Sequence, residues 1–169
     1  HVLDPTMLLD VQDYIDLVES ANVPKSKGTL LYYILDETKP TTDLISRLAD
    51  KTGLIPFHGN SRVEDWSAPL AERIQPPVEQ WLRGFMDAEL VVTDSFHACV
   101  FSILFHKPFI VVGNKERGLA RIKSLLNIFE LEKCLYEDQE LGMTNLNWNL
   151  VEENLYEWRK KSFSLINKL

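Results

Sequence analysis

The fold of this chain is decided by the stretch Leu90-Val91-Val92-Thr93-Asp94-Ser95-Phe96-His97-Ala98-Cys99-Val100-Phe101-Ser102. Its apolar beginning predicts a buried strand, and its apolar end predicts a buried helix. Between them stands a polar turn that contains Thr93, Asp94, Ser95 and His97. The first backbone N–H groups of a helix have no partner within the helix, so an anion can bind there. A serine at the cap of this helix and a histidine in its first turn therefore indicate an anion site.

Apolar runs and amphipathic helices alternate along the rest of the chain. Strands are expected over residues 29–35, 54–57, 90–93, 108–112 and 131–136. Helices are expected to begin near Asp10, Pro40, Pro76, Phe96, Leu119 and Asn147 or Asn149, and Gly53 is expected to end the second of them. Because the strand runs are apolar throughout, both faces of the sheet should be covered, as is typical of parallel sheets. We predict a single Rossmann-like, doubly wound α/β domain over residues 1–169, with a mainly parallel sheet and helices on both faces.

The composition excludes several classes of function. The chain has 169 residues, with 18 basic and 25 acidic side chains and a net charge of −7. This balance argues against a nucleic-acid partner, although it leaves room for a local basic pocket. Cys99 and Cys134 match neither a metal-ligand spacing nor a disulfide framework. No apolar run approaches the roughly 18 residues of a membrane span, and motifs for dinucleotides, P-loop phosphates or a nucleophile elbow are missing.

Polar residues follow three of the expected strands, at the edge where open α/β sheets bind their ligands. Asp36 follows the first strand, residues 94–97 follow the third, and residues 113–117 follow the fourth. The third and fourth strands are joined by one helix and should be neighbours, so their turns should face one crevice. The polar side chains that these two turns offer to an anion are Ser95, His97, Asn114, Lys115 and Arg117. Together they predict an anion-binding domain with His97 at its centre.

Each of these side chains also has a simpler structural role open to it. Ser95 is a good helix cap whatever the function, worth ~1 kcal/mol to the helix. His97 can hydrogen-bond to the sheet, and Asp94 can brace the turn. Lys115 and Arg117 can be ordinary solvated charges of a loop. The residues alone leave these alternatives open.

The turn and its surroundings resemble the polysaccharide pyruvyl transferase family. The matching segments are residues 88–97, 101–104, 107–110, 114–118 and 124–126. Leu3-Asp4-Pro5-Thr6 is similar to an Asp-Pro-Thr element in the second half of full-length members. Ala98 and Cys99 stand where the family commonly has a glycine and then a small or hydroxyl residue. The resemblance covers most of the chain but only part of the family's usual length.

The resemblance implies the C-terminal domain of a two-domain enzyme of glycosyltransferase B-type architecture, with a further N-terminal domain as its partner. It implies a pyruvyl transferase that moves pyruvate from phosphoenolpyruvate to two hydroxyls of a sugar, forming a ketal in a surface polysaccharide without a cofactor or metal. In the family, the residues that match Ser95, Phe96 and His97 lie at the donor site. We expect His97 to contact the phosphate or to act as the acid, and Arg117 to bind an anionic group of the donor.

The resemblance also implies a sugar or a lipid-linked oligosaccharide as the acceptor, and therefore a cytoplasmic enzyme that meets the inner membrane through this acceptor. We expect negligible transferase activity from this chain alone, because much of the acceptor site would lie on the other domain. Two other classes remain open. One is a nucleotide-sugar glycosyltransferase domain, for which Glu116 is the candidate ribose ligand, and the other is a non-catalytic module for anion binding or assembly.

Overall fold

The centre of the molecule is a parallel sheet of five strands. The computed structural model describes residues 2–61, 66–114, 118–136 and 145–168, and its strands lie in the order β2-β1-β3-β4-β5. The strands are β2 (Pro56–His58), β1 (Leu30–Tyr33), β3 (Leu90–Thr93), β4 (Phe109–Val112) and β5 (Leu135–Tyr136). All four neighbouring pairs are parallel. This order is one of the two common doubly wound arrangements, so the predicted Rossmann-like fold is confirmed.

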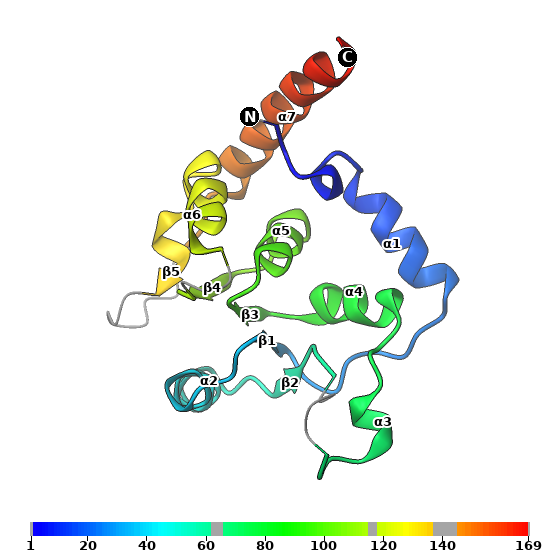
Figure 1. Cartoon of the computed structure of the whole chain (residues 1–169), viewed down its shortest axis with the longest axis vertical. Coiled ribbons are helices and arrows are strands. Elements are labelled where there is room, and N and C mark those ends of the chain that lie inside the picture. The colour runs from blue at the N-terminus through cyan, green and yellow to red at the C-terminus, as the bar shows by residue number, and fades with distance from the viewer. Residues whose placement is uncertain (1, 62–65, 115–117, 137–144, 169) are drawn as a thin grey trace.

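Helices cover both faces of the sheet, as Figure 1 shows. One face carries α2 (Lys39–Thr52), and the other carries α4 (Val78–Asp87), α5 (Phe96–Leu104) and α6 (Leu119–Ile128). Two more helices, α1 (Val11–Ser20) and α7 (Trp148–Ile166), pack outside the second group. The short elements are η1 (Pro5–Met7), α3 (Leu70–Arg73) and η3 (Glu132–Cys134). None of the helices in the described part of the chain is long and apolar enough to cross a membrane.

The strands divide their side chains between two apolar clusters. Val91 and Val111 belong to the large cluster beneath α4, α5 and α6. Leu30, Leu90 and Val92 belong to the smaller cluster beneath α2. Because alternate residues of a strand point to opposite faces, a strand that is apolar throughout must be covered twice. Each fully buried side chain of this kind contributes about 1.5–3 kcal/mol of transfer free energy.

Local signals place the helix ends. Asp10 caps α1 and forms a reciprocal capping box with Asp13, which satisfies two backbone donors of the first turn. Gly53 ends α2 in the left-handed region at φ 72°, where a side chain would be strained. The strand expected over residues 131–136 is wrong in its first half, because residues 132–134 form η3 and β5 has only two residues. The expected cap Asn147 is confirmed, since its side chain accepts from the Leu150 N–H.

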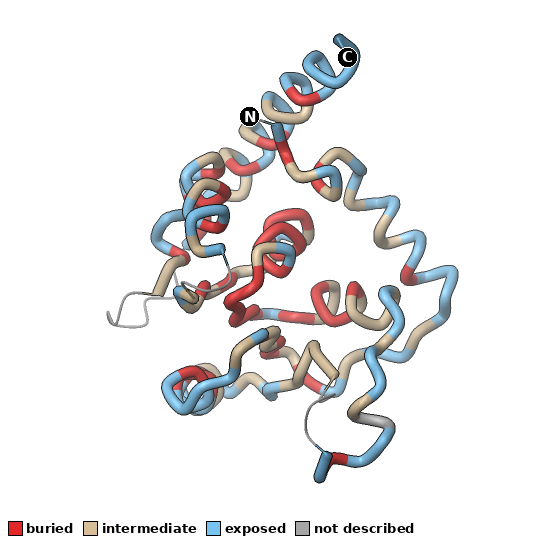
Figure 2. The backbone as a smooth tube through the Cα atoms, in the orientation of Figure 1, coloured by how far each residue is buried: buried red, intermediate tan, exposed pale blue. Residues whose placement is uncertain are grey.

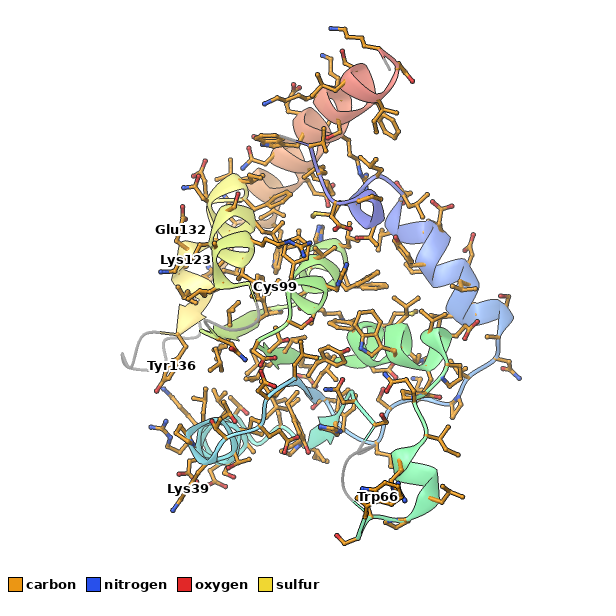
Figure 3. The ribbon with its side chains drawn as sticks, viewed as in Figure 1. Lys39, Trp66, Cys99, Lys123, Glu132 and Tyr136 are labelled. Atoms are coloured by element: carbon orange, nitrogen blue, oxygen red, sulfur yellow. The ribbon has the colours of Figure 1, made fainter. Side chains whose placement is uncertain are left out.

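Helix α5 is the most deeply buried helix of the domain. All of its residues from Ala98 to Leu104 are buried, and Figure 2 shows the helix in red along most of its length. Ser102 satisfies its hydroxyl by donating to the Ala98 carbonyl at 2.7 Å. Cys99 lies in the middle of this helix (Figure 3), and burial raises the pKa of its thiol far above the ordinary value. Cys99 is therefore a core residue, and the two positions that follow His97 contribute packing.

Candidate functional site

The direction in which the chain crosses the sheet reverses between the neighbouring strands β1 and β3. From β1 the chain passes through α2 to β2 on one side, and from β3 it passes through α5 to β4 on the other. Such a switch point is where ligands bind in open α/β sheets. The turns after β3 and β4 meet, as the sequence predicts, and the turn after β1 meets them as well.

Asp94 braces this edge. Its carboxylate accepts hydrogen bonds from the backbone N–H of Leu35 at 2.7 Å and of Asp36 at 3.2 Å. The Asn114 side-chain amide donates to Asp94 at 3.0 Å and to Asp36 at 2.7 Å. Asp94 is only 2% exposed, so its charge faces the turn after β1 and not the solvent. The bracing role considered from the sequence is confirmed, and Asn114 ties all three turns together.

The start of α5 is ordered by the hydroxyl of Thr93 and not by that of Ser95. Ser95 occupies the N-cap position of α5, as the sequence predicts, but its hydroxyl makes no capping hydrogen bond. Thr93 Oγ1 instead accepts from the Ser95 N–H at 2.9 Å and donates to the Tyr33 carbonyl at 2.6 Å. The hydroxyl that orders the turn therefore belongs to the last residue of β3, which also ties β3 to β1. Ser95 itself is buried, with 6% exposure.

His97 lies at the exposed end of the buried helix α5. Its side chain is 55% exposed, and its Nε2 lies 3.9 Å from Oδ2 of Asp4. The other carboxylate oxygen of Asp4 is held by Thr6, whose N–H donates at 3.1 Å and whose hydroxyl donates at 2.6 Å. The side chain of Asp4 is 14% exposed. The Asp-Pro-Thr turn therefore fixes one oxygen of Asp4 and leaves the other beside the histidine.

Arg121 brings a positive charge to the same place. It projects from the first turn of α6, and its Nη2 lies 3.8 Å from the same Oδ2 of Asp4. Its guanidinium carbon lies 4.2 Å from the centre of the Phe96 ring, an arrangement that favours a cation electrostatically. Phe96 also meets the His97 ring edge-on, with 5.5 Å between ring centres. These contacts join four residues into one group, which we call the Asp4 cluster: Asp4, Phe96, His97 and Arg121.

A cavity of about 380 Å³ opens beside the Asp4 cluster. Its walls are formed by residues 2–4, by Phe96 at the start of α5, and by the face of α6 that carries Arg121, Ser124, Leu125 and Ile128. The volume lies within the range of small-molecule sites. Most of the lining side chains are apolar, while Asp4, Arg121 and Ser124 supply polar groups.

The comparison with protein-family models identifies the chain. The model described as polysaccharide pyruvyl transferase matches residues 1–116. This chain belongs to that family. Membership indicates a transferase that acts in polysaccharide biosynthesis, and the matched range includes both Asp4 and His97. Searches of curated proteins and of solved structures gave no significant match.

The structure brings together only part of the site expected for this family member. His97 and Phe96 lie together in the Asp4 cluster, while Asn114 and Asp94 lie in the bracing network at the neighbouring strand ends. Lys115, Glu116 and Arg117 lie outside the described residues, so their predicted roles stay predictions. Within the described ranges, no group of three or more His, Cys, Asp or Glu side chains is placed to hold a metal ion.

Sequence reasoning missed Arg121 and Ser124 and gave Asp4 no role. Arg121 stands one turn into an amphipathic helix, where an arginine on a polar face is ordinary. Asp4 was visible only as part of the Asp-Pro-Thr element, and it lies far from His97 in the chain. The available signal was the short side chain of Asp4 followed by Pro5 and Thr6, a pattern that predicts a turn held by the carboxylate.

Proposed function

We propose that this domain takes pyruvate from phosphoenolpyruvate and transfers it to two hydroxyls of a polysaccharide sugar as a cyclic ketal. The family match supports a polysaccharide pyruvyl transferase, and the surroundings of His97 support phosphoenolpyruvate as the donor. This donor carries a phosphate and a carboxylate, both of which favour cations and N–H donors. At the start of α5, the helix N-terminus offers N–H donors and the exposed imidazole of His97 offers a further donor.

The observation that carries the proposal is the exposure of His97 on an otherwise buried helix. Residues 98–104 of α5 are all buried, and yet the side chain of His97 is 55% exposed beside a carboxylate and an arginine. Packing does not account for an imidazole in this position. Transfer requires a proton to be added to the methylene carbon of the donor, and a histidine is the side chain best suited to supply it near neutral pH.

The remaining parts of the donor site follow from the same proposal. The free N–H groups at the start of α5, with Ser95 and Phe96, form the floor of the site. Asn114, which follows β4 and donates to Asp94, borders the proposed site. Lys115 and Arg117 lie outside the described residues, and in this proposal they bind the anionic groups of the donor. The domain is proposed to be the C-terminal partner of a second Rossmann-like domain that closes over the site. The acceptor would be a sugar or a lipid-linked oligosaccharide at the cytoplasmic face of the membrane.

A thermal-shift measurement on the chain tests the donor. At a phosphoenolpyruvate concentration of 100 times the Kd, binding adds ~2.7 kcal/mol to the free energy of unfolding. For a domain of this size, that corresponds to a rise in Tm of roughly 5–10 °C. The rise should be absent from His97→Ala. Stabilisation by nucleotide-sugars instead would favour a glycosyltransferase domain, and stabilisation by neither ligand would favour a non-catalytic module.

In an intact two-domain enzyme, the assignment also predicts kinetics. His97→Ala and Arg117→Ala should each lower the rate of pyruvyl transfer, because each removes a donor contact or the acid. If both variants kept the rate of the unchanged enzyme, the proposed donor site would be wrong.

A further inference from the structure

The cavity beside the Asp4 cluster contains charges of both signs. Asp4 and Arg121 both line it, with 3.8 Å between their nearest charged atoms. Ser124 adds a hydroxyl from the next turn of α6. Phe96, Leu125 and Ile128 form apolar walls. The cavity therefore offers a strong acceptor, a strong donor and a neutral hydroxyl above an apolar surface.

This mixture fits a sugar better than it fits an anion. A carboxylate within a cavity repels a phosphate or another carboxylate, so Asp4 works against an anionic ligand at this place. A sugar has hydroxyls that both donate and accept, and its C–H faces pack against apolar side chains. A volume of about 380 Å³ accommodates a hexose ring with part of its neighbour. The cavity and the donor cradle at the start of α5 thus differ in their chemistry, although Phe96 belongs to both.

The geometry of Asp4 leaves one oxygen free to act on such a ligand. Oδ1 is held by two hydrogen bonds from Thr6. Oδ2 lies 3.8 Å from Arg121 and 3.9 Å from His97, beyond hydrogen-bond distance of both. The hydrogen bonds from Thr6 therefore orient Oδ2, while neither His97 nor Arg121 hydrogen-bonds to it. A hydroxyl in the cavity can donate to Oδ2 while its oxygen stays close to the imidazole.

We propose that this cavity is the acceptor subsite, in which the sugar ring lies between Phe96 and α6 and Asp4 Oδ2 receives the proton of the attacking hydroxyl. This inference rests on the proposed function, since it takes phosphoenolpyruvate at His97 as the donor. It adds the position of the acceptor and a catalytic role for Asp4. Arg121 and Ser124 bind further oxygens of the same sugar.

Asp4 and His97 together account for every proton that moves when the first hydroxyl attacks. The hydroxyl oxygen bonds to C2 of the enol, and the electron pair of the C2–C3 double bond takes a proton from protonated His97. The proton of the hydroxyl passes to Asp4, and its return from Asp4 to the neutral imidazole restores both groups. The second sugar hydroxyl then bonds to C2, the bond from C2 to the phosphate oxygen breaks with its electron pair, and the second proton leaves with the phosphate.

Binding measurements on the full chain test the acceptor subsite without requiring turnover. The probes are phosphoenolpyruvate and the methyl β-pyranosides of galactose, glucose and mannose, each titrated by NMR. Asp4→Asn removes the charge of the carboxylate, and Ser124→Trp fills the cavity. Asp43→Asn on α2 is the matched control, because Asp43 is exposed on the opposite face of the sheet.

At least one of the three pyranosides should bind the unchanged chain and the Asp43→Asn control. Its affinity should fall about tenfold in Asp4→Asn, the usual effect of losing a hydrogen bond to a charged group, and should be lost in Ser124→Trp. Phosphoenolpyruvate should bind Asp4→Asn at least as tightly as the unchanged chain, because a repulsive charge is removed. Phosphoenolpyruvate binding with no bound pyranoside, or with pyranoside affinities unchanged in both variants, would overturn the acceptor subsite alone. A chain that binds no phosphoenolpyruvate would overturn the proposed function.

Discussion

Replacing Asp94 by alanine should destabilise the domain more than any exposed charge would. Asp94 is 2% exposed and accepts three hydrogen bonds, from Leu35 N–H, Asp36 N–H and the Asn114 amide. A hydrogen bond to a charged group contributes about 1.5–3 kcal/mol, but the three donors stand at a partly solvated edge where water replaces some of the loss. We therefore expect Asp94→Ala to lower the free energy of unfolding by about 2–4 kcal/mol.

Urea denaturation followed by fluorescence of the four tryptophans measures this difference. Asp94→Asn keeps one acceptor oxygen and should lose about half as much stability as the alanine variant. Asp43→Ala, an exposed position on α2, is the control and should change the free energy of unfolding by less than about 0.5 kcal/mol. If Asp94→Ala were no less stable than Asp43→Ala, the bracing of the three strand ends by Asp94 would be refuted.

Three further outcomes can be measured on the same chain. Burial alone would raise the pKa of Asp87, but hydrogen bonds from the Ser26 N–H and Arg83 lower it from its ordinary value of 3.8. Asp87→Asn should therefore lower the free energy of unfolding above pH 4, and this difference should disappear as the pH falls through the folded-state pKa of Asp87. The urea midpoints of both chains, measured against pH, test this. Burial raises the pKa of the Cys134 thiol to about 12 and that of the Cys99 thiol further still. Neither thiol should therefore react with a disulfide reagent at pH 8 until urea unfolds the chain. Rapid reaction of the folded chain would contradict the burial of the two cysteines. A methyl group at Gly28 would lie 2.2 Å from the Ile55 carbonyl oxygen, so Gly28→Ala should lower Tm by several degrees, and an unchanged Tm would show that the backbone yields there.

The sequence predicts the sheet and its helices because each element is locally consistent. Apolar runs such as Leu90–Thr93 are too short for helices and too apolar to be covered on one side only. The Asp10 box and Gly53 mark helix ends through their own hydrogen bonds and backbone angle. The prediction fails at residues 131–134, because Glu132 and Lys133 are exposed in a 3-10 turn and only Leu131 and Cys134 of this stretch are buried.

The candidate site could be predicted only where its residues are close in sequence. His97 and Asp94 stand in one turn between two buried elements, so their polarity is conspicuous. Asp4 and Arg121 reach the same place from the N-terminal segment and from α6, and no local pattern connects them. The role of Ser95 was misjudged for a similar reason: the bond from Ser95 N–H to Thr93 depends on where β3 places the threonine beside β1.

The central claim is that His97 binds the donor, and the imidazole proton resonances of the chain test it most directly. His58 is held by Glu37 and Asn60, and His106 is held by Glu152 and stacks on Trp148. Titration with phosphoenolpyruvate should therefore move the resonance of His97, assigned through its loss in His97→Gln, and leave those of His58 and His106 in place. A His97 resonance that does not move, or that moves equally with the same concentration of inorganic phosphate, would contradict the account.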